Sequence, residues 1–210
     1  MKILSSRVIY ILMDESTEYE IRELDPALLD DYLNFFDNIA FADNPKWASC
    51  YCYFPHAPHD IEKWHDRTGE QNRASVIESI REGRMHGYLA YKDGAPVAWC
   101  NAGPRTAVTI LDPDMDAQKI GSIVCFIVAK PHRGKGVARR LLDAACDGFR
   151  RQGFEIAEAY PRPDAHDDAT SHFGPLKMLI DAGFQPFKED NGSLIVRKRL
   201  ESVAIGSDES

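Results

Sequence analysis

The segment between residues 123 and 149 constrains the fold more than any other part of the sequence, because three different patterns follow one another there. The apolar run from Ile123 to Ala129 is rich in β-branched residues and too short to cross a membrane, which favours a buried strand. A basic turn with two glycines comes next. Apolar residues then recur at helical spacing, with the charged residues largely off the stripe, which predicts an amphipathic helix. The stripe consists of Ala138, Leu141, Leu142, Ala145 and Phe149.

The turn between this strand and this helix has the composition of a phosphate-binding loop. Gly134 and Gly136 carry no Cβ, so a ligand can approach the main chain closely. The first amides of a helix have no internal partner and carry partial positive charge. Arg133 and Lys135 add whole charges beside them. The segment therefore predicts a cradle for phosphate groups, although it fits neither the P-loop nor the three-glycine dinucleotide pattern, in which Arg139 takes the third glycine position.

The turn resembles the pyrophosphate loop of the GNAT superfamily, the acetyl-CoA-dependent N-acetyltransferases. The pattern of that loop is Gln/Arg-x-x-Gly-x-Gly/Ala after a central strand. Here the loop reads Pro131-His132-Arg133-Gly134-Lys135-Gly136. Proline at the first position departs from the pattern and removes one polar side chain, but it leaves the glycine amides in place. An Asp93-Gly94 hairpin and a late helix from Ser171 to Ala182, which stops at Gly183-Phe184, extend the resemblance over roughly residues 19 to 199.

The resemblance implies one α/β (α+β) domain over residues 1–200, with its core at 19–199. We expect a mixed, strongly twisted sheet of about seven strands with helices on both faces. The apolar run at 7–12 predicts an extra N-terminal strand, which would extend the sheet or meet a second subunit of a homodimer. Residues 201–210 have the composition of a disordered tail.

Composition and charge narrow the function classes. No stretch is long and apolar enough for a membrane helix, and the N-terminus lacks the apolar core of a signal peptide. Five scattered cysteines indicate reduced thiols and a cytoplasmic protein. A net charge of −8 argues against general nucleic-acid binding and favours cationic acceptors such as amines.

The resemblance also implies which residues hold acetyl-CoA, the co-substrate. The pantetheine arm would pair with the main chain of the central strand, and an amide near its end would stabilise the developing oxyanion. The strand residues are Phe126, Ile127 and Val128. Main-chain amides of the loop and the first helical turn would hold the pyrophosphate. These residues are His132, Arg133, Gly134, Lys135, Gly136, Val137 and Ala138.

The catalytic acid is less constrained by the sequence. Many relatives carry a tyrosine four residues before the Gly-Phe that ends the late helix, where this sequence has Leu179. Our candidate is Tyr160, at the end of the strand that follows the amphipathic helix, with Ser171 or His172 as substitutes. A role for Tyr160 as a core residue at a strand end is the alternative.

Glu158, on the same strand as Tyr160, is our candidate base. Asp116, in the loop before the central strand, is an alternative base. A chain of water molecules to solvent could also remove the proton from the amine. Cys125 on the central strand raises a second mechanism, acyl relay through a thiolate, but no histidine is paired with it in the sequence.

An irregular aromatic segment between residues 41 and 58 is the predicted wall of the acceptor pocket. Trp47, Tyr51 and Tyr53 are the candidate substrate-binding residues, with padding of a side core as the alternative role. The same segment carries two cysteines and two histidines, which are residue types that can bind zinc. Their spacing differs from that of common zinc sites, so we expect no metal. They are Cys50, Cys52, His56 and His59.

The sequence therefore predicts transfer of an acetyl group from acetyl-CoA to a primary amine of a small molecule, by direct attack of the amine. Acetylation of a protein N-terminus or lysine is one alternative. A CoA-binding regulator without catalysis is the other, because the relatives' tyrosine is missing at Leu179.

Overall fold

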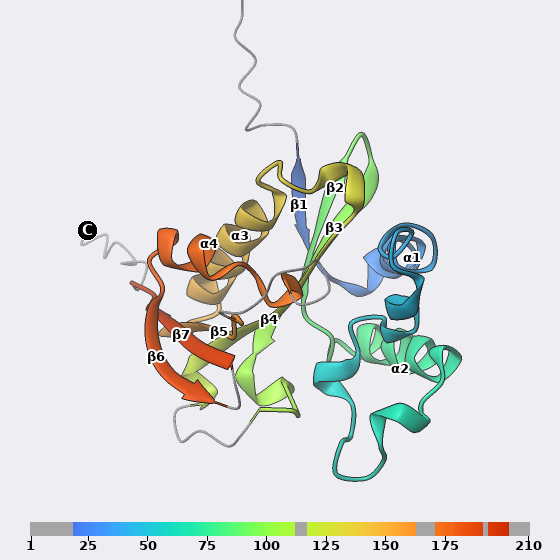
Figure 1. Ribbon diagram of the computed structural model, residues 1–210, viewed down its shortest axis with the longest axis horizontal. Helices are drawn as coiled ribbons and strands as arrows, with labels where there is room; N and C mark the ends of the chain where they lie inside the picture. Colours follow the sequence, from blue (N-terminus) through green and yellow to red (C-terminus); the bar gives the residue numbers. More distant parts are fainter. Residues whose placement is uncertain (1–18, 112–116, 163–170, 191–192, 202–210) are drawn as a thin grey trace, which may run out of the picture.

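The computed structural model describes residues 19–111, 117–162, 171–190 and 193–201, and these form one seven-stranded sheet with helices packed on both faces (Figure 1). The order of the strands is β1-β2-β3-β4-β5-β7-β6. The strands are β1 (Glu20–Glu23), β2 (Gly87–Lys92), β3 (Ala95–Pro104), β4 (Ile120–Val128), β5 (Ile156–Ala159), β6 (Gln185–Asp190) and β7 (Ser193–Arg199). The helices are α1 (Leu29–Asn34), α2 (Gly69–Arg81), α3 (Val137–Arg151) and α4 (Leu176–Asp181). The predicted N-terminal strand at 7–12, Asp116 and the tail from residue 202 lie outside the described residues.

Pairing within the sheet is antiparallel everywhere except between β4 and β5. This parallel pair extends only from Ile120 to Ile123 on β4, against Ile156 to Ala159 on β5. Strand β4 continues to Val128 with β3 as its partner on one side, so the two parallel strands part halfway along β4. The mixed sheet with helices on both faces confirms the predicted fold.

Two hydrophobic cores lie on opposite faces of the sheet. On one face α3 buries its predicted apolar stripe, including Leu141, Leu142 and Ala145, against the strands. On the other face α1 and α2 pack over the side chains of β3 and β4, with Tyr32 and Trp99 fully buried. Figure 1 shows the same division, with α3 and α4 on one side of the strands and α1 and α2 on the other.

Local sequence signals place several element ends. The side chain of Asp25 caps the turn that begins at Pro26 by accepting from the amide of Ala27, as expected from the sequence. At α2 the Thr68 hydroxyl and the Gln71 side chain form a reciprocal capping box. No helix in the described residues is both long enough and apolar enough to span a bilayer.

The predicted helix from Ser171 to Ala182 is wrong in its extent. A 3-10 turn covers Ser171–Phe173, and α4 begins only at Leu176. The cause is Pro175, because a proline disfavours the helical conformation in the residue before it and has no N–H to continue a helix. The turn at Ser171–Phe173 lies against β4. Gly174, directly after it, approaches the ring of Phe126, which is on the part of β4 beyond its pairing with β5.

Candidate active site

The part of β4 beyond Ile123 presents main-chain groups on its open side. The amide of Ala129 donates to the carbonyl of Val97, on the side of β3, at 3.0 Å. Because successive amides of a strand point to opposite edges, the amides of Phe126 and Val128 face away from β3. The carbonyl of Val128 points the same way and accepts from Nε of Arg133 at 3.0 Å. In the described residues neither amide donates to a main-chain oxygen, so this edge offers two amides to a ligand.

The loop after β4 forms a second set of donors. Gly134 and Gly136 have φ of +73° and +78°, and a Cβ on either would meet nothing within 4 Å. In the described part of the chain, the amides of residues 134–139 donate to no main-chain oxygen, whereas the amide of Arg140 donates to Gly136. These open amides at the start of α3 fit the negative charge of a pyrophosphate.

The first two residues of the predicted amide cradle use their amides differently. The amide of His132 donates to the carbonyl of Ala129 at 2.8 Å, and that of Arg133 donates to Lys130 at 3.3 Å. Their side chains fix the loop instead. Arg133 pairs with Asp43 at 2.7 Å, and His132 Nδ1 lies 3.1 Å from the hydroxyl of Tyr19. The amides open to a ligand therefore begin at Gly134.

A buried polar cluster holds the two predicted catalytic residues. Glu158 is fully buried, and its carboxylate accepts from Arg105 at 2.9 Å, from Arg197 at 2.6 Å and from the hydroxyl of Tyr160. The hydroxyl of Ser122 on β4 lies 2.8 Å from that of Tyr160. Burial first, and then the charge of Glu158, raises the pKa of Tyr160 well above its ordinary value, so the phenol stays protonated at neutral pH.

Of the three predicted acceptor residues, Trp47 has different neighbours from Tyr51 and Tyr53. The ring of Trp47 lies 5.6 Å from the ring of His172, so the aromatic segment meets the turn at Ser171–Phe173 that contacts β4. Tyr51 instead donates its hydroxyl to Asp37 at 2.7 Å, and burial raises the pKa of Tyr51 to about 12. Of the three, Trp47 is the side chain that joins the two segments flanking the open part of β4.

The ring of Tyr53 lies 5.1 Å from the guanidinium of Arg67, which bonds Asn72 of α2. Tyr53 therefore stands on the α2 side of the aromatic segment, like Tyr51, whose partner Asp37 is paired with Arg73 of α2. The contact of Trp47 with His172 could not be predicted from the sequence, because no local pattern links two residues so far apart in the chain.

The zinc alternative finds no support in the described residues, where no group of three or more His, Cys, Asp or Glu side chains could hold a metal ion. The histidines turn to main-chain carbonyls: His56 Nδ1 donates to Ala107 at 2.8 Å, and His59 Nε2 donates to Phe54 at 2.7 Å. Leu179, at the position of the relatives' tyrosine, is fully buried in the core under α4.

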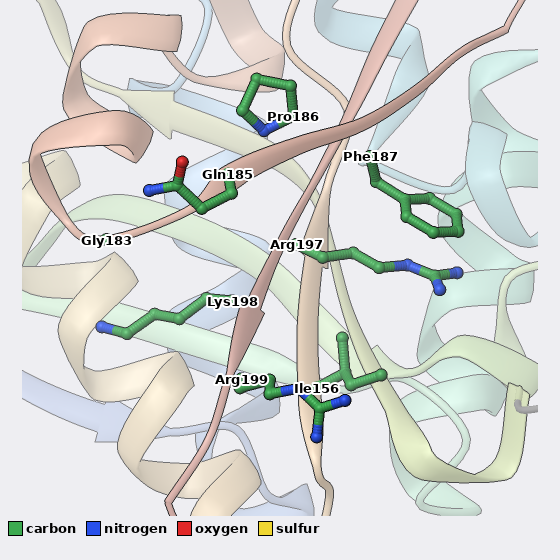
Figure 2. Close-up of a pocket in the computed structure, with 8 residues that line it drawn as sticks. All are labelled: Ile156, Gly183, Gln185, Pro186, Phe187, Arg197, Lys198 and Arg199. Carbon is green, nitrogen blue, oxygen red and sulfur yellow. The ribbon is translucent and has the colours of Figure 1, made fainter.

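A groove of about 560 Å³ lies at the β6–β7 edge of the sheet (Figure 2). Its lining residues are Ile156, Gly183, Gln185, Pro186, Phe187, Arg197, Lys198 and Arg199. Figure 2 shows Arg197 and Lys198 extending to opposite sides of β7. Arg197 is engaged by Glu158 and by the ring of Phe187, and Lys198 donates to the carbonyl of Ala182. The amides at the glycine loop suit a phosphate ligand better than these engaged cations.

The comparisons with known proteins agree with this geometry. The model of the acetyltransferase (GNAT) family matches residues 39–173, so the chain belongs to that family. By family it is therefore an acetyl-CoA-dependent N-acetyltransferase. A search of curated protein sequences gives no match.

Solved structures share the fold at low sequence identity. An N-acetyltransferase from Staphylococcus aureus superposes with a TM-score of 0.53 at 16% identity, covering 88% of this chain and 100% of that one. The putative acetyltransferase yncA from Salmonella typhimurium, solved with acetyl-CoA, has a TM-score of 0.51 at 16% identity, covering 90% and 97%. The PaiA N-acetyltransferase from Thermoplasma acidophilum, solved with coenzyme A, has a TM-score of 0.51 at 15% identity, covering 86% and 98%.

Proposed function

We propose that the enzyme acetylates a primary amine of a small molecule. The observation that carries this proposal is the contact between Trp47 and His172, which joins the segments on either side of the open part of β4. Joined walls restrict access from the side, and this suits a compact acceptor better than a peptide lying in an open groove. The net charge of −8 also favours approach of a cationic amine.

In this proposal the main chain binds the co-substrate. The amides of residues 134 to 138 would hold the pyrophosphate, and the open edge at Phe126–Val128 would hold the pantetheine arm. Acetyl-CoA supplies the acetyl group as a thioester. An open amide at Phe126 or Val128 would donate a hydrogen bond to the carbonyl oxygen as negative charge develops on it.

Tyr160 and Glu158 are the proposed acid and base, linked to β4 through the Ser122 hydroxyl. The raised pKa of Tyr160 keeps its proton in place at neutral pH, which an acid requires. Both oxygens of Glu158 already accept hydrogen bonds, so it orients the phenol as well. Tyr160→Phe removes the proton while keeping the ring, and it is the variant that tests this role.

The acceptor class is tested by release of free thiol from acetyl-CoA. One set of acceptors contains small primary amines, including polyamines and amino sugars, and the other contains peptides with a free N-terminus or a lysine. We expect kcat/KM for the best small amine to exceed that for every peptide by more than tenfold. Peptides that react as fast as the small amines would overturn the proposal. The cytoplasmic location and the homodimer remain predictions. Gel filtration of the purified protein would test the homodimer.

A further inference from the structure

Two cysteines far apart in the sequence belong to one buried cluster beside the open part of β4. Cys52, in the aromatic segment, is 3% exposed, and Cys125, on β4 next to Phe126, is 6% exposed. Asn101 of β3, which is the register partner of Cys125, bridges to Cys52. Its Nδ2 donates to the Cys52 sulfur at 3.3 Å and lies 3.2 Å from the Cys52 carbonyl.

The sulfur of Cys52 accepts a hydrogen bond from Asn101 and lies in a buried cluster that also contains Trp99. The indole Nε1–H of Trp99 is fully buried and has no hydrogen-bond partner among the described residues. Burial opposes ionisation of Cys52, but the neighbouring side chains of Cys125, Asn101 and Trp99 outweigh it and lower the pKa of this thiol. The hydrogen bond to Cys52 and burial raise the pKa of Cys125. Cys52 is therefore the more acidic thiol of the pair.

The backbone at Cys52 and at the residue before it has a strained conformation. Tyr51 and Cys52 have φ of +47° and +51°, two successive non-glycine residues in the left-handed region. That conformation costs roughly 1–2 kcal/mol per residue and persists where the surroundings hold it. The hydroxyl of Tyr32 donates to the carbonyl of Tyr51 at 2.7 Å and holds this turn against α1.

His56 fixes the orientation of Asn101. Because His56 Nδ1 donates to the carbonyl of Ala107, the neutral ring keeps Nε2 as an acceptor. Nδ2 of Asn101 lies 2.9 Å from that Nε2 and donates to it. The amide group of Asn101 is therefore held with its N–H bonds directed to His56 and to Cys52, rather than with its oxygen toward the sulfur.

We propose that Cys52 and Cys125 are a peroxide-reactive thiol pair that closes to a disulfide. The Cys52 thiolate attacks hydrogen peroxide, an S–O bond forms as the O–O bond breaks, and hydroxide leaves. The Cys125 thiol then attacks the Cys52 sulfur, an S–S bond forms as the S–O bond breaks, and water leaves with the proton of Cys125. The pair loses two electrons, and peroxide is reduced. The bond ties the aromatic segment to β4, one residue from Phe126.

The test is peroxide treatment of the purified full-length protein, followed by thiol counting and by mapping of tryptic peptides without reduction. We expect two of the five thiols to disappear and the peptide with Cys52 to be joined to the peptide with Cys125. Cys50 is the matched control because it shares a peptide with Cys52, and burial raises the pKa of Cys50 to about 11. Cys50→Ser should keep the cross-link.

Two further variants separate the steps. Cys125→Ser should stop at the sulfenic acid of Cys52, which a 1,3-dione probe traps, and Cys52→Ser should leave Cys125 reduced. Circular dichroism establishes that each variant is folded, and alanine replaces serine where serine unfolds the chain. A cross-link that survives in folded Cys52→Ser would overturn the proposal. So would five intact thiols in the wild type at a peroxide concentration that oxidises free cysteine at the same pH.

Discussion

Gly136→Asp is the substitution that most directly perturbs the phosphate cradle. A Cβ at Gly136 meets no atom within 4 Å, so the new carboxylate projects into the space in front of the open amides. One unit charge at about 5 Å from a phosphate charge, at an effective dielectric constant of about 20, repels it by about 3 kcal/mol. Salt screening at an exposed loop reduces this repulsion, so we expect the Kd of acetyl-CoA to rise about 30- to 100-fold.

Isothermal calorimetry with acetyl-CoA and with CoA measures this loss, and two variants separate its causes. Gly136→Asn has nearly the same shape without the charge, so it should lose less than tenfold. Gly153→Asp provides the control for backbone strain, because Gly153 has φ of +82° and equally open surroundings at the other end of α3. It should bind acetyl-CoA like the wild type.

Salt dependence gives a second check on the electrostatic origin of the effect. The ratio of the Kd values of Gly136→Asp and Gly136→Asn should shrink as ionic strength rises. Thermal melting establishes that the variants are folded at the temperature of the titration. Wild-type affinity in folded Gly136→Asp would refute the assignment of the cradle, and an equal loss in Gly136→Asn would refute the charge argument.

Three further substitutions test other parts of the site. Tyr160→Phe should lower kcat by roughly 100-fold with little change in the Kd of acetyl-CoA, and a full kcat would show that the phenol is not the acid. Trp47→Ala should raise KM for the amine several-fold and leave acetyl-CoA affinity intact, whereas an unchanged KM would remove Trp47 from the acceptor wall. Burial lowers the pKa of His56 below 6.5, so the unfolded chain takes up a proton first and stability falls as the pH drops below about 6.5. His56→Gln should flatten that fall in urea unfolding between pH 7.5 and 5, and an unchanged slope would contradict the linkage.

Local patterns sufficed for the parts of the fold that depend on neighbouring residues. The apolar stripe of α3, the cap at Asp25 and the tight turn at Asp93-Gly94 each follow from residues a few positions apart, and the structure confirms them. The break before α4 was also readable, because Pro175 stands inside the predicted helix.

Contacts between distant segments could not be predicted in this way. Arg133 pairs with Asp43, and Arg105 pairs with Glu158, through folding of the whole sheet rather than through any local spacing. The resemblance to GNAT proteins supplied the loop and the strand that are proposed to hold acetyl-CoA. It could not supply Trp47 beside His172, because that contact depends on how the irregular segment crosses the sheet.

The short parallel pairing divides the sheet into two parts that share a narrow main-chain connection. Within the described residues, the main-chain pairing that joins β1–β4 to β5–β7 is the parallel ladder from Ile120 to Ile123. A bound co-substrate would form hydrogen bonds with the edge of β4 at Phe126 and Val128 and would also contact the turn at Ser171–Phe173. It would therefore connect the two parts of the molecule for as long as it stays bound. Loading the enzyme would then damp the twisting of one half of the molecule against the other, and release of CoA would restore it.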